Sequence, residues 1–196
     1  MVRFCKKCVT PSSRPRITFD KNGVCNACLV SIKKKKISWG KRKTIFLDII
    51  KEIKKYSKKK KLDYDCIVPW SGGKDSTSIA LKLKLEYDLN PLLVTFSPLM
   101  VNKTGAENRN LLIKKGFDTI FFKPNLRVSK LLAKRFFVER GNPKVAWDAG
   151  INSVPTSIAI KYKIPFIFYA EHGESEYGGH VLNKNSSRER DFEEVI

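Results

Sequence analysis

Six consecutive residues, Ser71-Gly72-Gly73-Lys74-Asp75-Ser76, combine the residue types that bind phosphate groups. The two glycines lack a Cβ atom, so the backbone can adopt positive φ there and approach an anion closely. Lys74 would add a positive charge, and Ser71 and Ser76 would offer hydroxyl hydrogen bonds. Asp75 would repel a bare phosphate, so we expect it to contact magnesium or to cap a helix. The segment, here called the 71–76 loop, predicts a polyphosphate site.

The 71–76 loop differs from the Walker A pattern G-x-x-x-x-G-K-S/T and from the pattern G-x-G-x-x-G. Its alternative interpretation is an ordinary tight turn followed by a helix cap. However, it follows the apolar residues 66–70 and precedes a helical pattern. The N–H groups and the partial positive charge at the start of such a helix attract anions. We therefore favour a phosphate-binding loop over a simple turn.

The elements that would position this loop alternate along the chain between short apolar strands and helical patterns. Such alternation is typical of an α/β fold with a doubly wound parallel sheet and helices on both faces. Ligands of such folds bind beyond the carboxyl ends of the strands, where the 71–76 loop would lie. We expect strands at residues 65–70, 92–97, 118–123 and 164–170, and helices at 40–60, 75–87, 104–115, 129–140 and 153–162.

Four of the five cysteines form two pairs, Cys5-x-x-Cys8 and Cys25-x-x-Cys28, with the spacing of a four-thiolate zinc site. Each pair would lie on a tight turn, and an Asn-Gly turn at residues 22–23 predicts a hairpin before the second pair. Two disulfides are the alternative, which a cytoplasmic location disfavours. The predicted zinc is structural, because its four ligands leave no open position. We expect Cys66, within the first strand, to be a buried small residue.

The composition of the 196-residue chain suits a core with a small satellite module. Its 39 Lys and Arg residues outnumber 19 Asp and Glu residues, giving a net charge of +20. This charge is compatible with a nucleic-acid partner such as tRNA and also with plain solvated lysine surfaces. The apolar runs are too short to cross a membrane, and the first residues contain no apolar segment as long as that of a signal peptide. We therefore expect a cytoplasmic protein without membrane insertion.

The 71–76 loop resembles the PP-loop of the N-type ATP pyrophosphatases, a group that includes GMP synthetase, asparagine synthetase and tRNA-thiolating enzymes. The resemblance implies a HUP-type sheet and a reaction in which ATP and Mg²⁺ transfer AMP to a substrate oxygen. It implies that Ser71, Gly72, Gly73, Lys74, Asp75 and Ser76 hold the pyrophosphate. The segment LLVTFS is similar to the second strand of this group, whose backbone meets adenine, so that Thr95 and Phe96 would contact the base.

Longer segments make the chain similar to the N-acetyl sugar amidotransferases of surface-polysaccharide (lipopolysaccharide, O-antigen) and flagellar-glycan synthesis. The resemblance implies that ATP activates the N-acetyl oxygen of a sugar and that ammonia then displaces AMP to give an acetamidino group. A partner glutaminase and a cyclase-like channel protein would supply the ammonia. The segments that carry the resemblance are the cysteine region 4–28 with Arg14-Pro15 and ITFD, then DYDCIVPWSGGKDST (63–77), LNPLLVTF (89–96), YKIPF (162–166) and EHGESEYGG (171–179).

The resemblance divides the chain into a zinc-ribbon-like module at residues 1–35 and a PP-loop ATP pyrophosphatase domain at residues 36–196. Family members are longer than this chain. We therefore expect the sequence to be the N-terminal part of a longer protein or a truncated copy. The chain departs from the family in the stretch AWDAG (146–150), where a cysteine- or histidine-bearing stretch is expected. The role of Asp148 in this stretch is therefore open.

The candidate catalytic residues are Lys74 and Asp75 of the loop. Three more follow the last strand: the acids Glu171 and Glu174, and His172. Acids at the ligand-binding edge of a sheet can hold magnesium, orient a sugar or take protons from ammonia. The alternative is a solvated acidic loop. Asn108 and Arg109, near the start of a helix, would face either the site or the solvent.

Three functions remain open from the sequence. The first is the sugar amidotransferase. The second is a tRNA-modifying PP-loop enzyme of the thiolase type, which a basic surface favours, but for which Cys66 is the sole cysteine outside the predicted zinc site. The third is a truncated ATP-binding protein without catalysis.

Overall fold

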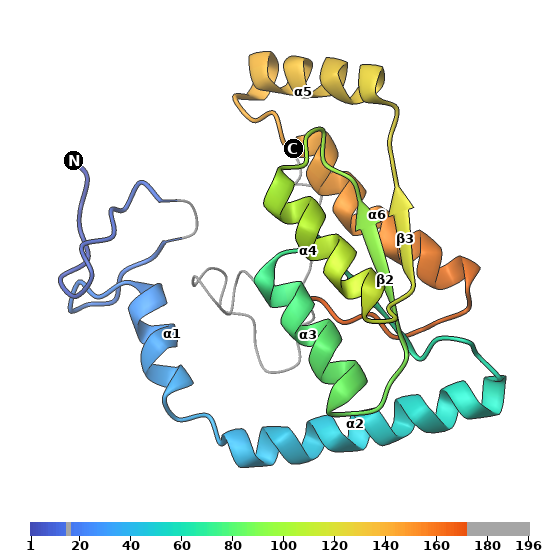
Figure 1. Cartoon of the computed structure of the whole chain (residues 1–196). Helices are drawn as coiled ribbons and strands as arrows, with labels where there is room; N and C mark the ends of the chain where they lie inside the picture. Colours follow the sequence, from blue (N-terminus) through green and yellow to red (C-terminus); the bar gives the residue numbers. More distant parts are fainter. Residues whose placement is uncertain (15–16, 172–196) are drawn as a thin grey trace. The chain divides into compact units, whose positions relative to one another are not determined.

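A computed structural model describes residues 1–14 and 17–171 of the chain (Figure 1). The predicted site residues His172 and Glu174 lie outside the described residues. The chain divides into two compact units, of which the first contains Met1–Ile45 and the second contains Phe46–Ala170. No helix in the described ranges is long and apolar enough to cross a membrane.

The first unit is built around two turns and one helix. An antiparallel bridge joins Phe4 to Pro11, and a second joins Phe19 to Cys25. The predicted hairpin is therefore confirmed, with Gly23 at φ +75° in its turn, a conformation that favours glycine. The hairpin leads directly into α1 (Asn26–Lys34), a helix that was not predicted from the sequence.

The second unit contains a parallel sheet of three strands, β1 (Cys66–Pro69), β2 (Pro91–Phe96) and β3 (Thr119–Phe122), in the order β1-β2-β3. These confirm three of the four predicted strands. The predicted strand at 164–170 is reduced to an isolated parallel bridge between Ile67 and Ile167. Ile67 joins this segment to β1, through the Phe166 carbonyl and the Phe168 amide. The next residue of β1 that faces the same way is Pro69, which lacks an N–H group and cannot continue the ladder.

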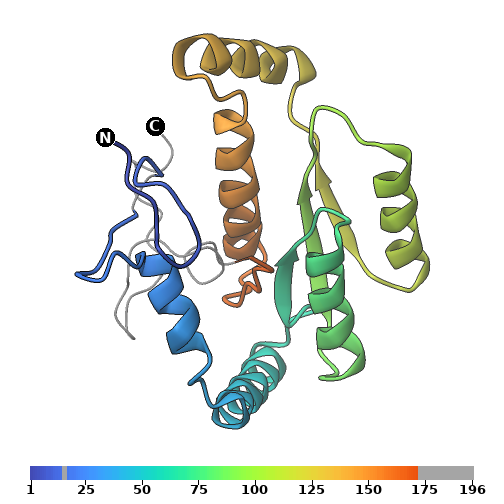
Figure 2. The same ribbon diagram turned by 90° about the vertical axis from the view of Figure 1, so that its left-hand side faces the viewer.

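Helices cover both faces of the sheet, as predicted. Figure 2 shows α6 on one side of the strands and α3 and α4 on the other. This arrangement follows from right-handed crossovers, because the chain steps outward from β1 to β3 and then returns to the opposite side of β1. The helices of this unit are α2 (Trp39–Lys60, from Phe46 onward), α3 (Lys74–Leu85), α4 (Lys103–Lys114), α5 (Leu126–Arg140) and α6 (Val145–Lys161).

Alternate residues of the strands enter two separate cores. Cys66, Val68 and Leu93 pack against α2, α3 and α4, whereas Ile67 and Leu92 pack against α6. Because successive side chains of a strand point to opposite faces, the apolar runs of β1 and β2 require a sheet that is buried on both sides. The two cores fix β1 and its following loop in the centre of this unit.

Helix α6 begins at Val145, eight residues before the helix start that was predicted at 153. Two residues that disfavour helices, Gly150 and Pro155, obscured this start, but both are buried inside α6. Gly150 lies against β2, and a Cβ atom built there would meet ring atoms of Phe96 at 2.4 Å. The AWDAG stretch is therefore the first part of α6, and its glycine permits close packing of α6 over the end of β2.

We expect Gly150→Ala to destabilise the protein by about 1–3 kcal/mol, because the added methyl group must displace the Phe96 ring. Gly40→Ala is the matched control, since it is a helical glycine with nothing within 4 Å of a built Cβ atom. That change should stabilise α2 slightly. Urea unfolding of both variants measures the difference. Equal stability of Gly150→Ala and the wild type would contradict the observed packing.

Candidate functional site

The described residues contain two candidate sites, and the first is a cluster of four cysteines. The sulfur atoms of Cys5, Cys8, Cys25 and Cys28 all lie within 4.8 Å of one another. Cys5 and Cys28 are 4.0 Å apart at Sγ, and Cys8 and Cys25 are 3.5 Å apart. Sulfur ligands at about 2.3 Å from a tetrahedral zinc ion have a similar mutual spacing. The cluster could therefore hold a structural metal ion such as zinc.

The surroundings favour the thiolate form at Cys5 and Cys8, whereas burial raises the pKa of Cys25 and of Cys28. Burial raises the pKa of Cys5, but hydrogen bonds from the backbone N–H groups of Cys25, Lys7 and Cys8 outweigh it and lower this pKa to about 6. The sulfur atom of Cys8 lies 3.1 Å from the Thr10 hydroxyl. Such N–H and O–H donors to sulfur stabilise thiolates, the form that binds metals.

The second cysteine pair differs from the predicted tight turn. Cys25 is the N-cap of α1 and Cys28 lies in its first turn, so both are presented by the positive end of a helix. All five cysteines are free. The Sγ–Sγ separations of 3.5 and 4.0 Å are far longer than a disulfide bond of about 2.05 Å. The geometry disfavours the alternative of two disulfides.

The second candidate site is the 71–76 loop between β1 and α3. Gly72 has φ +85°, and a Cβ atom there would lie 3.1 Å from Arg109 Cγ and 3.3 Å from the Gly105 carbonyl oxygen. Gly73 is the N-cap of α3 and has ordinary extended backbone angles. Because glycine offers no side-chain acceptor, the N-cap residue does not cap the first turn of α3. The predicted strand–loop–helix junction is therefore present.

The polar side chains of the loop lie close to its backbone. The Ser71 hydroxyl accepts a hydrogen bond from Gly73 N–H at 3.2 Å, and the buried Ser76 donates to the Gly73 carbonyl at 3.4 Å. Lys74 Nζ contacts both Asp75 carboxylate oxygens at 2.8 Å. Asp75 thus lies in the first helical turn, and the expected cap position belongs to Gly73. This exposed ion pair contributes little stability, so a ligand could displace it at small cost.

The neighbouring strand brings the other predicted residues to the same edge of the sheet. Pro69 pairs with Val94, so Thr95 and Phe96 lie beside the start of the loop. Thr95 is buried and its hydroxyl donates to the Trp70 carbonyl. Trp70 N–H bonds to Val94, whereas Ser97 N–H bonds to β3. The N–H and C=O groups of successive residues in β2 point alternately toward β1 and toward β3. Those of Phe96 therefore point toward the β1 side, at a level beyond the last residue of β1.

The loop lies where the strand order reverses. β1 has β2 on one side and the Ile167 segment on the other, with all of them parallel. Open α/β sheets bind ligands at the carboxyl edge of such a position. Glu171 follows the Ile167 segment and is exposed. The structure therefore places residues 71–76, Thr95 and Phe96 at one edge.

Two residues of α4 also contact the loop, although the sequence left their orientation open. Arg109 Nε donates to the Ser71 carbonyl at 3.3 Å, and Asn108 Nδ2 donates to the Gly72 carbonyl at 3.4 Å. The sequence analysis did not identify Gly105, whose carbonyl lies against Gly72. The spacing from Gly105 to Asn108 and Arg109 is that of one helix face, which could have indicated a common neighbour.

Cys66 has the environment of a structural residue. It is fully buried in β1, and burial together with the nearby Asp65 carboxylate raises the pKa of its thiol to about 12. Because thiolates are the reactive form of cysteine, this thiol is poorly suited to sulfur transfer.

Comparison with known proteins gives no functional assignment. No protein-family model matches the chain. An uncharacterized protein of Methanocaldococcus jannaschii is 32% identical over 105 residues, which cover 53% of this chain and 36% of that protein. The match thus spans about a third of the relative's length.

Proposed function

We propose that the 71–76 loop binds the pyrophosphate end of ATP and that the protein is an AMP-forming amidotransferase for an N-acetylated sugar. The observation that carries this proposal is the start of α3 after β1, where the N-cap residue Gly73 offers no side-chain cap, at the point where the strand order reverses. The proposal includes a HUP-like doubly wound fold for the second unit. The strand order, with the Ile167 segment beside β1, supports it.

Each predicted residue has a specific part in this proposal. The N–H groups at the start of α3 would bind phosphate oxygens, and Lys74 would leave Asp75 to neutralise the leaving pyrophosphate. Asp75 would then be available for the Mg²⁺ ion that accompanies ATP. The backbone of Phe96 would meet the adenine ring. Glu171, His172 and Glu174 would act on the sugar or on ammonia.

The proposed reaction has two steps. The acetamido oxygen of the sugar attacks the α-phosphorus of ATP, a P–O bond forms, and pyrophosphate leaves. Ammonia, supplied by a glutaminase and cyclase-like partner, then attacks the activated carbon, and AMP leaves with the former amide oxygen. After loss of a proton, the product carries an acetamidino group. Such phosphoryl chemistry depends mainly on positioning and on neutralising charge, which a preorganised backbone loop supplies.

Product analysis tests the proposal. The purified full chain is incubated with ATP, Mg²⁺, ammonium and candidate N-acetylated sugar nucleotides. We expect AMP, pyrophosphate and a sugar whose mass shows replacement of O by NH, all of them dependent on the sugar. ATP binding without any turnover would instead indicate the non-catalytic ATP-binding alternative. Absence of ATP binding would contradict the proposal as a whole.

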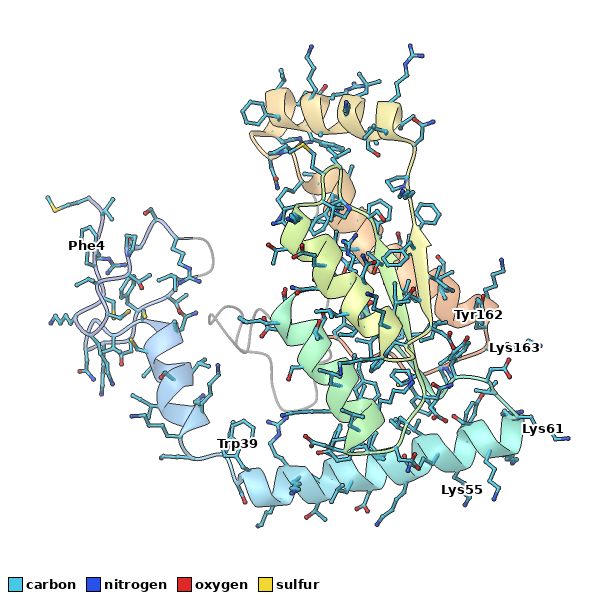
Figure 3. The ribbon with its side chains drawn as sticks, in the orientation of Figure 1. Phe4, Trp39, Lys55, Lys61, Tyr162 and Lys163 are labelled. Carbon is cyan, nitrogen blue, oxygen red and sulfur yellow. The ribbon has the colours of Figure 1, made fainter. Side chains whose placement is uncertain are left out.

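A lysine-rich face of α2 favours a second candidate function, a tRNA-modifying PP-loop enzyme. Lys51, Lys54, Lys55 and Lys58 recur at helical spacing, next to the face that buries Ile50 and Ile53 in the core. Lys51 and Lys54 pair with Asp48 and Asp88. Within the described part of the chain, no ion pair involves Lys55 or Lys58–Lys61. Figure 3 shows Lys55 of α2 and Lys61, which follows the helix, with their side chains pointing outward.

The charge-reversal variant Lys55→Glu/Lys58→Glu separates the two functions. Under the amidotransferase proposal, we expect it to leave ATP- and sugar-dependent AMP formation unchanged, because these side chains are on α2, which contributes nothing to the 71–76 loop. Under the tRNA alternative, AMP formation by the wild type would require tRNA. The variant would then lose tRNA affinity and show a shallower salt dependence. Measuring AMP release with and without tRNA at two salt concentrations distinguishes these outcomes.

A further inference from the structure

Two side chains of α4 hold the two carbonyl groups at the start of the 71–76 loop. Arg109 donates to the Ser71 carbonyl, and Asn108 donates to the Gly72 carbonyl, at 3.3 and 3.4 Å. Helix α4 is tightly fitted at this point, since any side chain at Gly72 would meet the Gly105 carbonyl oxygen. The loop is therefore fixed by side chains from a different helix.

Holding these carbonyls also orients the N–H groups that follow them. In a trans peptide the C=O and the next N–H point in opposite directions. A Ser71 carbonyl turned toward α4 directs the Gly72 N–H away from α4. The Gly72 carbonyl does the same for the Gly73 N–H, which donates to the Ser71 hydroxyl until an anion replaces that acceptor. Carbonyl oxygens repel phosphate, whereas successive N–H groups form an anion-binding concavity. The contacts from α4 thus separate the repelling groups of the loop from the attracting ones.

The surroundings of Arg109 suit a fixed donor. Its guanidinium lies over the Phe121 ring, 5.6 Å from the centroid, which restricts its plane. In residues 1–14 and 17–171, no carboxylate lies within 4.0 Å of the Arg109 nitrogens. Partial burial lowers the pKa of Arg109, although a guanidinium stays charged. Placing a half-buried cation against a carbonyl group without a counter-ion costs desolvation energy. Packing of α4 against the loop does not by itself require a cation at this position.

We propose that Arg109, assisted by Asn108, is a positioning residue that keeps the 71–76 loop in its anion-binding form. This inference rests on the proposed function of that loop and assigns to α4 a part in it. Arg109 acts through the Ser71 carbonyl, so its geometry matters as well as its charge. A lysine at this position would keep the charge but would lack the Nε donor to the Ser71 carbonyl and the planar guanidinium that lies over the Phe121 ring.

The test compares four variants of the full chain by titration calorimetry with ATP, inorganic pyrophosphate and AMP. We expect Arg109→Gln to weaken ATP and pyrophosphate binding by about tenfold or more, in line with the loss of a charge-assisted hydrogen bond. Asn108→Ala should weaken both by a smaller factor. Arg109→Lys should fail to restore the affinity. Lys114→Gln, which removes one positive charge from the exposed end of the same helix, is the matched control and should bind as the wild type does.

Affinity for AMP separates positioning of the loop from general damage, because AMP lacks the pyrophosphate group. We expect the affinity for AMP to stay at the wild-type value in every variant. Equal loss of ATP and AMP affinity, full affinity in Arg109→Gln, or full recovery in Arg109→Lys would each overturn it. If Arg109→Gln does not fold, Asn108→Ala and Arg109→Lys give the same comparison. A wild type that binds neither ATP nor pyrophosphate would instead contradict the proposed function.

Discussion

Replacing Gly73 by valine is expected to lower the affinity for ATP by about tenfold or more while leaving the fold intact. Gly73 has φ −77° and ψ 163°, which any residue can adopt, and a Cβ atom there would meet only the Ser71 hydroxyl oxygen, at 3.1 Å. The valine side chain would instead occupy the space above the first turn of α3, where phosphate oxygens must approach. Each lost hydrogen bond to a charged group costs about 1.5–3 kcal/mol, or roughly tenfold to hundredfold in affinity.

Gly72→Ala provides the matched comparison, because its structural cost is different. At φ +85° an alanine is strained by about 1–2 kcal/mol, and its Cβ would also press on Arg109 and the Gly105 carbonyl. We therefore expect Gly72→Ala to lower both the stability and the ATP affinity, and Gly73→Val to lower the affinity alone. Thermal unfolding and titration calorimetry measure the two effects. Wild-type ATP affinity in Gly73→Val would contradict the account of the loop.

Removing the metal from the cysteine cluster is expected to unfold the first unit and to leave the second folded. The first unit has a very small core, in which Cys5, Cys25 and Cys28 are themselves the buried residues. We expect such a unit to depend on a bound metal, because structural zinc supplies about 10–16 kcal/mol of apparent binding free energy in small modules. The second unit has two apolar cores of its own. Metal removal should therefore affect the two units separately.

Cys8→Ser is the variant of choice for this prediction, since Cys8 is the exposed member of the cluster. We expect it to lose the bound metal, measured by elemental mass spectrometry, and to lose hydrogen-exchange protection in residues 1–45 alone. Cys66→Ala is the control: its metal content should equal that of the wild type, because Cys66 lies in β1. Full metal content in Cys8→Ser, or unchanged protection of residues 1–45, would show that the cluster is not a structural metal site.

The parts of the fold that were predicted from the sequence depend on local patterns. The continuous apolar runs of β1 and β2 indicated strands that are buried on both faces, and both lie between two cores. The spacing of the four cysteines similarly predicted that their sulfur atoms would meet. In these cases, the residue types and their spacing along the chain were sufficient for the prediction.

The parts that were not predicted depend on contacts between distant segments. The early start of α6 requires Gly150 to fit against Phe96, and no local pattern reveals that contact. The orientation of Arg109 depends on how α4 packs against Gly72, 37 positions away in the numbering. The strand predicted at 164–170 is only a bridge, because β1 ends at Pro69, which cannot donate a further hydrogen bond to this segment. Tertiary packing decides each of these features.

A crystal structure of the protein with Mg²⁺ and an ATP analogue that has a methylene bridge between the α- and β-phosphates would show directly whether the 71–76 loop binds pyrophosphate. We expect the β- and γ-phosphate oxygens to lie within hydrogen-bonding distance of the backbone nitrogens of residues 73–76, and Lys74 to have left Asp75 to contact them. An analogue that is bound elsewhere, with these nitrogens and the Lys74–Asp75 pair unchanged, would contradict the account.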